Sequence, residues 1–276
     1  MSKVWLITGS GSGLGRNITE AALAKGERVV ATARNIGQLD DLVNQYGDQI
    51  RVVTLDVTVE EAAQAAVQVA LNAFGRLDVL VNNAGYGDIR PFEETSSEDF
   101  KTLMDTCFYG VVYLTRAALP IMRKQRSGHI LNISSVGGRL ATPGSAAYHA
   151  AKWAVGGFTE AVAMETAHFG VKISALEPGG MRTNWVGRAI NKRPALLPDY
   201  EASVGALLKM MDDLQGQEKG DPVKVADVVL QLAYADELPA HLLLGVDAAQ
   251  GAELAEQQRA ADAKRWHEVT ISTEYE

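Results

Sequence analysis

The chain has 276 residues, 47% of them hydrophobic and 22% charged, and a formal net charge of -8. This length and hydrophobic content are enough to bury a full core in one large α/β domain. The acidic balance argues against a nucleic-acid or anionic-membrane surface, and the single cysteine, Cys107, excludes an internal disulfide and a thiolate metal cluster.

The sequence becomes apolar almost at once, at Val4, which leaves no room for a signal peptide after Met1. No uninterrupted apolar run approaches the roughly 18 residues that a membrane span requires. We therefore expect a cytoplasmic protein that binds neither nucleic acid nor a membrane.

Short apolar runs alternate with segments of helical period up to about residue 177. Strands are predicted over residues 3–8, 28–33, 50–55, 78–82, 129–134 and 171–177, and helices over 13–25, 36–46, 59–74, 96–124 and 146–168. Strands rich in Val, Ile and Leu that alternate with helices imply a parallel sheet covered by helices on both faces. The prediction is a doubly wound, Rossmann-like α/β fold, with residues 1–276 as a single domain because no repeat or linker interrupts them.

The alternation breaks after Glu177. Pro178-Gly179-Gly180 ends the strand, and a segment of about 184–220 follows with apolar residues at helical spacing between loops. Because ligands of open α/β sheets bind beyond the carboxyl ends of the strands, we expect this insertion to be a substrate lid. The alternative is a surface helix packed permanently on the core. A helix over 222–234, a strand over 241–245 and a helix over 248–266 complete the domain.

A glycine-rich segment, Thr8-Gly9-Ser10-Gly11-Ser12-Gly13-Leu14-Gly15, joins the first strand to the first helix. Glycines allow a tight turn and let the backbone approach a pyrophosphate, and the helix start offers unpaired N–H groups. The spacing Gly-x-x-x-Gly-x-Gly differs from the Gly-x-Gly-x-x-Gly fingerprint. Its strand-turn-helix setting predicts a dinucleotide site rather than a merely flexible turn. The expected contacts are Gly9, Ser12, Gly13, Leu14 and Gly15.

The end of the second strand bears on the cofactor. Ala33 is followed there by Arg34, whereas an NAD site usually places a carboxylate for the ribose 2′-hydroxyl. A guanidinium pairs well with a phosphate through charge-assisted hydrogen bonds. We therefore expect NADP rather than NAD. The alternative is that Arg34 is an ordinary solvated residue at a strand end.

Two further loops follow predicted strands. In Asp56-Val57, after the third strand, Asp56 either accepts a hydrogen bond from adenine or caps the next helix. Asn82-Asn83-Ala84-Gly85, after the fourth strand, places amides and a glycine where the chain runs close to a ligand. Asn side chains also stabilise turns by local hydrogen bonds, so either Asn alone is a weak signal.

Tyr148 and Lys152 are four residues apart at the head of a predicted helix, so both side chains leave the same face. A free tyrosine has a pKa of about 10, and a nearby ammonium helps to lower that pKa toward neutrality. Ser135 ends the strand-like run before this helix, and a returning loop turns its hydroxyl toward the phenol. Two hydroxyls that meet at one carbonyl oxygen prepare that carbonyl to accept a hydride. Tyr-x-x-x-Lys alone occurs by chance in many helices.

Together these residues resemble the short-chain dehydrogenase/reductase family over residues 3 to about 185. The matching motifs are Thr8-Gly9-x-x-x-Gly13-x-Gly15, Asn82-Asn83-Ala84-Gly85, Ser135 thirteen residues before Tyr148, Lys152, and Pro178-Gly179 with Thr183. Each motif is weak singly, but all of them in order and at compatible spacing are specific. The remaining third of the chain resembles the family only in the order of its elements.

The resemblance implies a role for each residue. Tyr148 is the general acid for carbonyl reduction and the base for alcohol oxidation. Lys152 lowers the phenol pKa and binds the nicotinamide ribose, and Ser135 holds the substrate oxygen. Thr183 contacts the nicotinamide end, beside Pro178 and Gly179. The cofactor supplies the hydride chemistry, while the protein supplies alignment and electrostatics.

One position departs from the family. Its usual fourth catalytic residue is an asparagine, thought to hold a water that relays protons to the lysine, and Cys107 stands there. A thiol replaces an amide poorly as donor and acceptor. Cys107 also falls on an apolar helical stripe, which favours a small core residue over a redox role. We expect the protein to remain active. His149, the neighbour of Tyr148, points about 100° away from it in a helix and is expected to pack rather than to act as a base.

The leading interpretation is an NADP-dependent oxidoreductase for a ketone, an aldehyde or a secondary alcohol. Apolar residues of the insertion suggest a mainly apolar substrate, or else they seal the insertion onto the protein; they are Trp185, Val186, Ile190, Leu196, Leu197 and Tyr200. The rival is a nucleotide-binding sensor of the same fold with little turnover. A sugar-nucleotide epimerase or dehydratase is a third option, although such family members usually carry a different glycine spacing. The resemblance also implies a homodimer or homotetramer that associates through helices 96–124 and 146–168.

Overall fold

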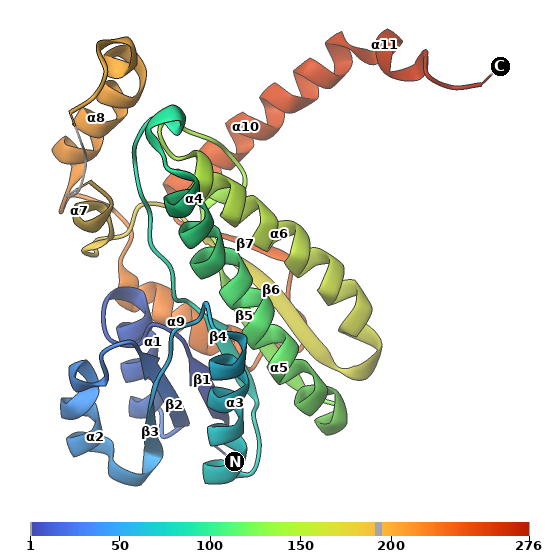
Figure 1. The fold of residues 1–276 in the computed structure, drawn as a ribbon. Helices are drawn as coiled ribbons and strands as arrows, with labels where there is room; N and C mark the ends of the chain where they lie inside the picture. Colours follow the sequence, from blue (N-terminus) through green and yellow to red (C-terminus); the bar gives the residue numbers. More distant parts are fainter. Residues whose placement is uncertain (1, 191–194, 276) are drawn as a thin grey trace.

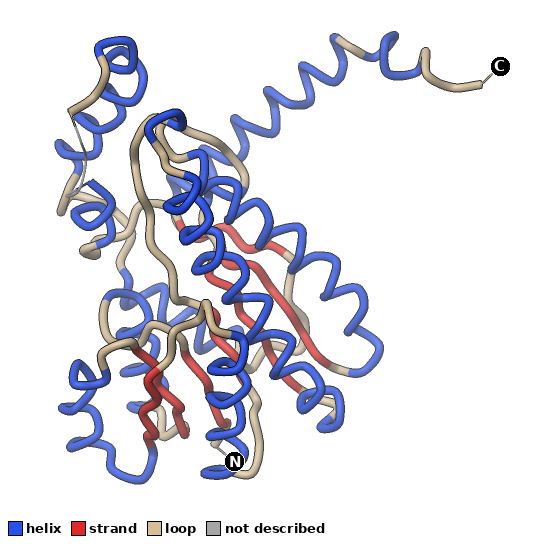
Figure 2. Tube along the Cα trace, viewed as in Figure 1, coloured by secondary structure: helices blue, strands red, loops and turns tan. Residues whose placement is uncertain are grey.

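A parallel seven-stranded sheet forms the centre of the protein, whose computed structural model describes residues 2–190 and 195–275 (Figures 1 and 2). Its strands are β1 (Val4–Ile7), β2 (Arg28–Ala33), β3 (Ile50–Thr54), β4 (Val79–Asn82), β5 (Gly128–Ile133), β6 (Val171–Pro178) and β7 (His241–Leu244). The order across the sheet is β3-β2-β1-β4-β5-β6-β7, and each neighbouring pair is parallel. The direction of winding reverses between β1 and β4, which is where ligands bind in open α/β sheets.

Helices cover both faces of this sheet, as Figure 1 shows. They are α1 (Gly13–Ala24), α2 (Asp40–Tyr46), α3 (Glu60–Phe74), α4 (Ser97–Met104), α5 (Gly110–Gln125), α6 (Ala146–Thr166), α7 (Trp185–Ile190), α8 (Ala206–Leu214), α9 (Pro222–Leu232), α10 (Val246–Arg265) and α11 (His267–Ile271). The predicted doubly wound α/β fold is therefore confirmed.

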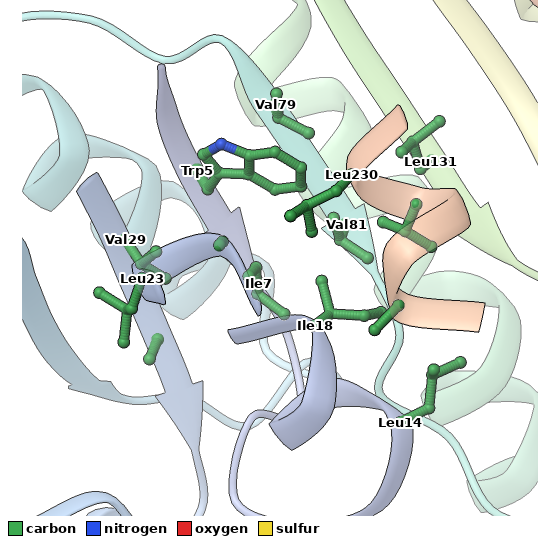
Figure 3. Packing of buried hydrophobic residues seen from close by; sticks show 14 of the residues in the cluster. Trp5, Ile7, Leu14, Ile18, Leu23, Val29, Val79, Val81, Leu131 and Leu230 are labelled. Atoms are coloured by element: carbon green, nitrogen blue, oxygen red, sulfur yellow. The ribbon is translucent and has the colours of Figure 1, made fainter. Parts of the chain in front are cut away.

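Side chains of β1 alternate between two cores, as the pleat of a strand requires. Trp5 and Ile7 pack with Ile18 of α1 and Leu230 of α9, and Figure 3 shows this packing. Leu6 faces the opposite layer, where it packs under α3 and α5. The first of these cores places the N-terminus of α1 at the carboxyl end of β1.

The predicted helix over 96–124 is not one regular α-helix. A π-helical turn over Asp105–Tyr109 separates α4 from α5. Gly110 directly after this turn lies so close to Val57 that a Cβ added to it would be 2.8 Å from the Val57 Cγ2. The extra residue of a π turn shifts the register of the apolar face, so the two helices can both follow the sheet.

Two parts of the chain stand away from the sheet. α7 and α8 of the insertion form a separate group in Figure 1, and α10 with α11 projects from the body as an arm. Ala248 and Ala252 in the first half of α10 are buried, and Arg139 pairs with Glu256 at 2.5 Å. Among residues 2–190 and 195–275, none of the helices has the length and hydropathy to span a bilayer.

Candidate active site

α6 presents Tyr148 and Lys152 from one face of its first two turns. The Lys152 side chain is buried, and its Nζ donates a hydrogen bond of 2.8 Å to the carbonyl of Ile133 in β5. The same Nζ lies 5.7 Å from the centre of the Tyr148 ring. The sheet and the helix therefore hold the amine beside the phenol, as the four-residue spacing predicts.

Ser135 comes from the loop that leaves β5. Its Oγ accepts a hydrogen bond of 3.0 Å from the Gly137 N–H and also reaches the Tyr148 hydroxyl. His149 closes this loop, because its Nε2 accepts from the Thr142 N–H at 2.9 Å and its Nδ1 lies 2.8 Å from the Gly137 carbonyl. His149 is buried in these contacts, and its tautomer with a proton on Nδ1 satisfies both.

The electrostatics of the site differ from the expected ones. Enclosure in the protein raises the pKa of the Tyr148 phenol, and the hydrogen bond from Ser135 acts in the opposite direction. Burial also lowers the pKa of the Lys152 ammonium. The expectation that the phenol pKa falls toward neutrality is thus wrong for the chain by itself, because desolvation is the largest influence on the pKa of Tyr148. The phenol is held in its protonated, proton-donating form.

The glycine-rich loop makes a tight turn under the end of β4. Gly9 and Gly13 have positive φ angles of 70° and 56°, a region that favours glycine. A Cβ added at Gly15 would lie 2.3 Å from the Gly9 carbonyl oxygen, so this turn excludes a side chain there. Asn83 Nδ2 donates 2.8 Å to the Thr8 carbonyl, and Thr8 Oγ1 accepts from the Ala84 N–H at 2.9 Å. Asn83 and Ala84 therefore shape the loop.

The N-terminus of α1 is open, as a dinucleotide site requires. Its N-cap residue Ser12 is exposed, makes no side-chain cap hydrogen bond, and is followed by no acidic residue in the first turn. A Cβ at Gly13 would meet only the Thr183 Cβ, 4.0 Å away. Leu14 is buried, so its backbone is fixed by the core. Free N–H groups at a helix start with room above them fit the pyrophosphate of a nicotinamide dinucleotide.

Asp56 makes local hydrogen bonds but does not cap α3, whose N-cap residue is Val59 without a side-chain cap. Its Oδ1 accepts from the Thr58 N–H at 3.0 Å and from the Thr58 hydroxyl at 2.7 Å, and these hydrogen bonds lower the pKa of the carboxyl. Val57, next to it, is buried. Arg34 at the end of β2 is exposed, and among the described residues it forms no ion pair. Arg34 attracts the Asp56 carboxylate at longer range, and without an ion pair its guanidinium can still meet a phosphate.

The turn after β6 is held by Asp247, which sequence reasoning missed. Asp247 Oδ2 accepts from the Gly180 N–H at 2.7 Å, and it would lie 2.3 Å from a Cβ at Gly179. Pro178 is buried at the strand end, and Thr183 Oγ1 accepts from the Trp185 N–H at 3.2 Å. Asp247 lies in the first turn of α10, far away in sequence, and an isolated acid in a helical first turn carries no signal of this contact.

Comparison with known proteins decides the family. A model of the short chain dehydrogenase family matches residues 3–194. The chain belongs to the short-chain dehydrogenase/reductase family. An oxidoreductase of Botryotinia fuckeliana is 43% identical over 274 residues, which cover 99% of this chain and all of that protein. A 3-ketodihydrosphingosine reductase of Bacteroides thetaiotaomicron is 35% identical over 215 residues, or 76% of each protein.

Solved structures share the fold, and two of them are described as short-chain dehydrogenases. One from Streptomyces avermitilis has a TM-score of 0.90 and 38% identity, with both chains covered completely. One from Burkholderia phymatum in complex with NAD has a TM-score of 0.82 and 28% identity, covering 95% of each chain. ElxO with NADP bound has a TM-score of 0.77 and 30% identity, covering 91% of this chain and all of that one. An enzyme that uses a nicotinamide cofactor is therefore supported, with both NAD and NADP found in its neighbours.

Cys107, at the position of the usual family asparagine, lies in the π-helical turn and is buried. Its Sγ is 3.3 Å from the Tyr86 carbonyl oxygen. A Cβ at Gly85 would be 3.4 Å from this sulfur and 3.8 Å from Lys152 Nζ, so the thiol and the amine flank the same backbone. The thiol packs as a small core residue, and Lys152 donates its hydrogen bond to the Ile133 carbonyl instead.

Trp185 of α7 is a second site residue whose contacts the sequence did not predict. Its ring lies 5.3 Å from the Tyr148 ring, centre to centre. A Cβ at Gly87 would be 2.2 Å from Trp185 Cζ2, so the indole occupies the space that Gly87 leaves open. The short helix α7 itself was not predicted, because its six residues are too few to show a period.

Proposed function

We propose that the protein is an NADP-dependent oxidoreductase that transfers a hydride between the cofactor and a ketone or aldehyde, or a secondary alcohol, of mainly apolar character. The observation that carries this proposal is the Tyr148 group, by which we mean Ser135, Tyr148 and Lys152. In this group, a protonated phenol and an amine from the first two turns of α6 meet a second hydroxyl from the loop that follows β5.

Each member of the Tyr148 group has a proposed role. The Tyr148 hydroxyl donates its proton to the carbonyl oxygen as that oxygen gains negative charge, and takes a proton back in the reverse direction. The Ser135 hydroxyl donates a second hydrogen bond to the same oxygen. Lys152, held by Ile133, positions the nicotinamide ribose and supplies positive charge near the phenolate. The bound cofactor supplies or accepts the hydride.

Two observations support NADP. Arg34 is exposed and forms no ion pair with the described residues, so its guanidinium is available for a 2′-phosphate. An NAD site usually holds a carboxylate for the ribose at the end of the second strand, where this chain has Ala33. The Ala33 methyl group would lie 3.4 Å from a Cβ added to Gly11. The other expected cofactor contacts are Gly9, Ser12, Gly13, Leu14, Gly15, Asp56, Val57, Asn83, Ala84, Gly85, Pro178, Gly179 and Thr183.

An apolar substrate fits the surroundings of the phenol. Trp185 lies against Tyr148, and the insertion behind it is built on an apolar cluster that includes Val186, Leu196 and Tyr200. The 35%-identical relative is a reductase of 3-ketodihydrosphingosine by name, which is a keto compound. We therefore propose that residues of about 184–220 line the substrate side, of which 191–194 lie outside the described residues.

A homodimer or homotetramer remains part of the proposal. A groove of about 480 Å³ lies on the expected contact surface, and its lining is rich in aromatic and apolar side chains. These residues are Phe100, Lys101, Met104, Asp105, Tyr109 and Tyr113.

The test measures turnover of the protein and the effect of removing the Arg34 charge on cofactor binding. The protein is mixed with NADPH or NADH and a panel of apolar and polar ketones, and the nicotinamide absorbance is followed. We expect loss of absorbance with NADPH and apolar ketones, and Arg34→Ala should raise the Kd for NADPH about tenfold, or about 1.4 kcal/mol, while sparing NADH. Lys124→Ala, which removes an exposed charge at the far end of α5, is the matched control.

Binding of NADPH without absorbance loss against any of these carbonyls would favour the rival, a nucleotide sensor with little turnover. Equal use of NADH and NADPH by the unaltered protein would overturn the cofactor assignment alone.

A further inference from the structure

Arg188 of α7 reaches from the insertion to the glycine-rich loop. Its Nη1 lies 3.4 Å from the Oγ of Ser12, the N-cap residue of α1. Thr183, just before the insertion, is close as well: a Cβ added to Gly13 would lie 4.0 Å from the Thr183 Cβ. The start of the insertion therefore lies directly against the start of α1, although the two are about 170 residues apart in sequence.

The charges at this contact are unbalanced. A helix N-terminus carries a positive partial charge, so a guanidinium placed beside it is electrostatically unfavourable. The first turn of α1 contains no acidic residue, and Ser12 does not cap it through its side chain. Within the part of the chain that the structure describes, Arg188 has no carboxylate partner. Its guanidinium contacts the Ser12 hydroxyl. A guanidinium and a helix N-terminus side by side at an exposed position are suited to an anion that both can bind.

We propose that Arg188 binds the pyrophosphate of the dinucleotide opposite the N–H groups of α1. This inference rests on the proposed function only in that the ligand is a nicotinamide dinucleotide. The pyrophosphate is common to NAD and NADP, so Arg188 contributes equally to both, whereas Arg34 is proposed to act on the 2′-phosphate that NADP alone carries.

The position of Arg188 also connects the two ends of the site. Trp185 and Arg188 are three residues apart in α7, so their side chains project from the same side of the helix. Trp185 contacts Tyr148 and fills the space beside Gly87. The helical turn that carries Arg188 also carries Trp185, which already lies beside the phenol. α7 therefore joins the pyrophosphate end of the site to the wall beside the phenol.

The experiment measures the Kd of NADPH and of NADH by calorimetry, without substrate, for the unaltered protein and for three variants. We expect Arg188→Ala to raise both Kd values about tenfold and by the same factor, since the lost contact is to the shared pyrophosphate. Arg188→Lys should lose less, because the charge remains while the two-pronged geometry is lost. Lys209→Ala removes an exposed charge from α8 of the same insertion and should leave both Kd values unchanged.

Inorganic pyrophosphate provides a second measurement. It should compete with NADPH for the unaltered protein, and about tenfold more of it should be needed for Arg188→Ala. Increasing salt should weaken NADPH binding less steeply in Arg188→Ala than in the unaltered protein, because one charge contact is missing. Arg188 is exposed, so thermal unfolding should be unchanged and a loss of binding can be assigned to the contact.

Several results would overturn the assignment of Arg188. One is that the Kd values of Arg188→Ala for both cofactors stay within twofold of those of the unaltered protein at low salt. Another is a loss confined to NADPH, which would place the guanidinium at the 2′-phosphate. Failure of the proposed NADP preference looks different: Arg34→Ala would then change nothing, while Arg188→Ala would still weaken both cofactors.

Discussion

The Tyr148 group and the insertion meet over the same phenol, yet they are held in different ways. Lys152 is tied to the backbone of β5, and Gly138 of the neighbouring loop is so close that an added Cβ would be 2.9 Å from the Lys152 carbonyl oxygen. The insertion instead buries a small cluster of its own, which contacts the rest of the protein through Ile89 and beside Gly144. The first region is fixed by the main core, and the second by a few apolar contacts.

This contrast predicts different kinetic effects for substitutions in the two regions. Changes in the Tyr148 group should act on the chemical step, because the geometry around them does not relax. Changes at the contacts of the insertion should act on substrate binding, because a small cluster can shift without unfolding the sheet. The following predictions test that division, from the largest expected effect to the smallest.

Tyr148→Phe should lower kcat for ketone reduction by about 10²- to 10⁴-fold, the usual contribution of a positioned proton donor. The Kd for NADPH should stay within about threefold, and the fold should be intact, because only one oxygen is removed from a half-buried ring. Single-turnover kinetics and calorimetry measure the two quantities. Retention of more than a tenth of the rate would remove Tyr148 from the chemistry.

The raised pKa of Tyr148 predicts opposite pH profiles for the two directions. Reduction needs the protonated phenol, which persists through neutral pH, so its kcat should be flat from pH 6 to 8. Oxidation needs the phenolate, whose fraction grows tenfold per pH unit below the pKa, so its kcat should rise about 100-fold over two pH units. A profile of oxidation that is flat between pH 7 and 9 would contradict the assigned base.

Gly87→Ala should raise KM for an apolar ketone about tenfold while kcat changes little. The new methyl group overlaps the Trp185 ring, which must move away from Tyr148 and so loses its contact with the substrate. Gly157→Ala in α6, where nothing lies within 4 Å of an added Cβ, is the matched control and should leave KM unchanged. A fall in kcat with constant KM would show that the insertion acts on the chemical step after all.

Cys107→Asn should leave the rate of carbonyl reduction unchanged or raise it by no more than about threefold, roughly 0.7 kcal/mol in activation free energy. Lys152 already donates a hydrogen bond to the Ile133 carbonyl, so the family amide is not needed to hold the amine. Steady-state kinetics measure the rate, and thermal unfolding reports whether the larger side chain fits beside Gly85. A large loss of rate with intact stability would count against this view of Cys107.

The sequence by itself determined the alternation of strands and helices, the glycine-rich turn and the register of Tyr148 with Lys152. These features depend on local periodicity and on backbone positions that exclude side chains, such as Gly9 and Gly15, so they can be read along the chain. The predicted strands match β1 to β7 within a residue or two at their ends.

Tertiary structure alone decided the contacts between distant segments. Asp247 against Gly180, Trp185 against Gly87 and Arg188 against Ser12 join residues 67, 98 and 176 positions apart, and no local pattern encodes such pairs. Packing also decided the sign of the phenol's pKa change, because desolvation depends on everything that surrounds Tyr148 and not on the lysine four residues away.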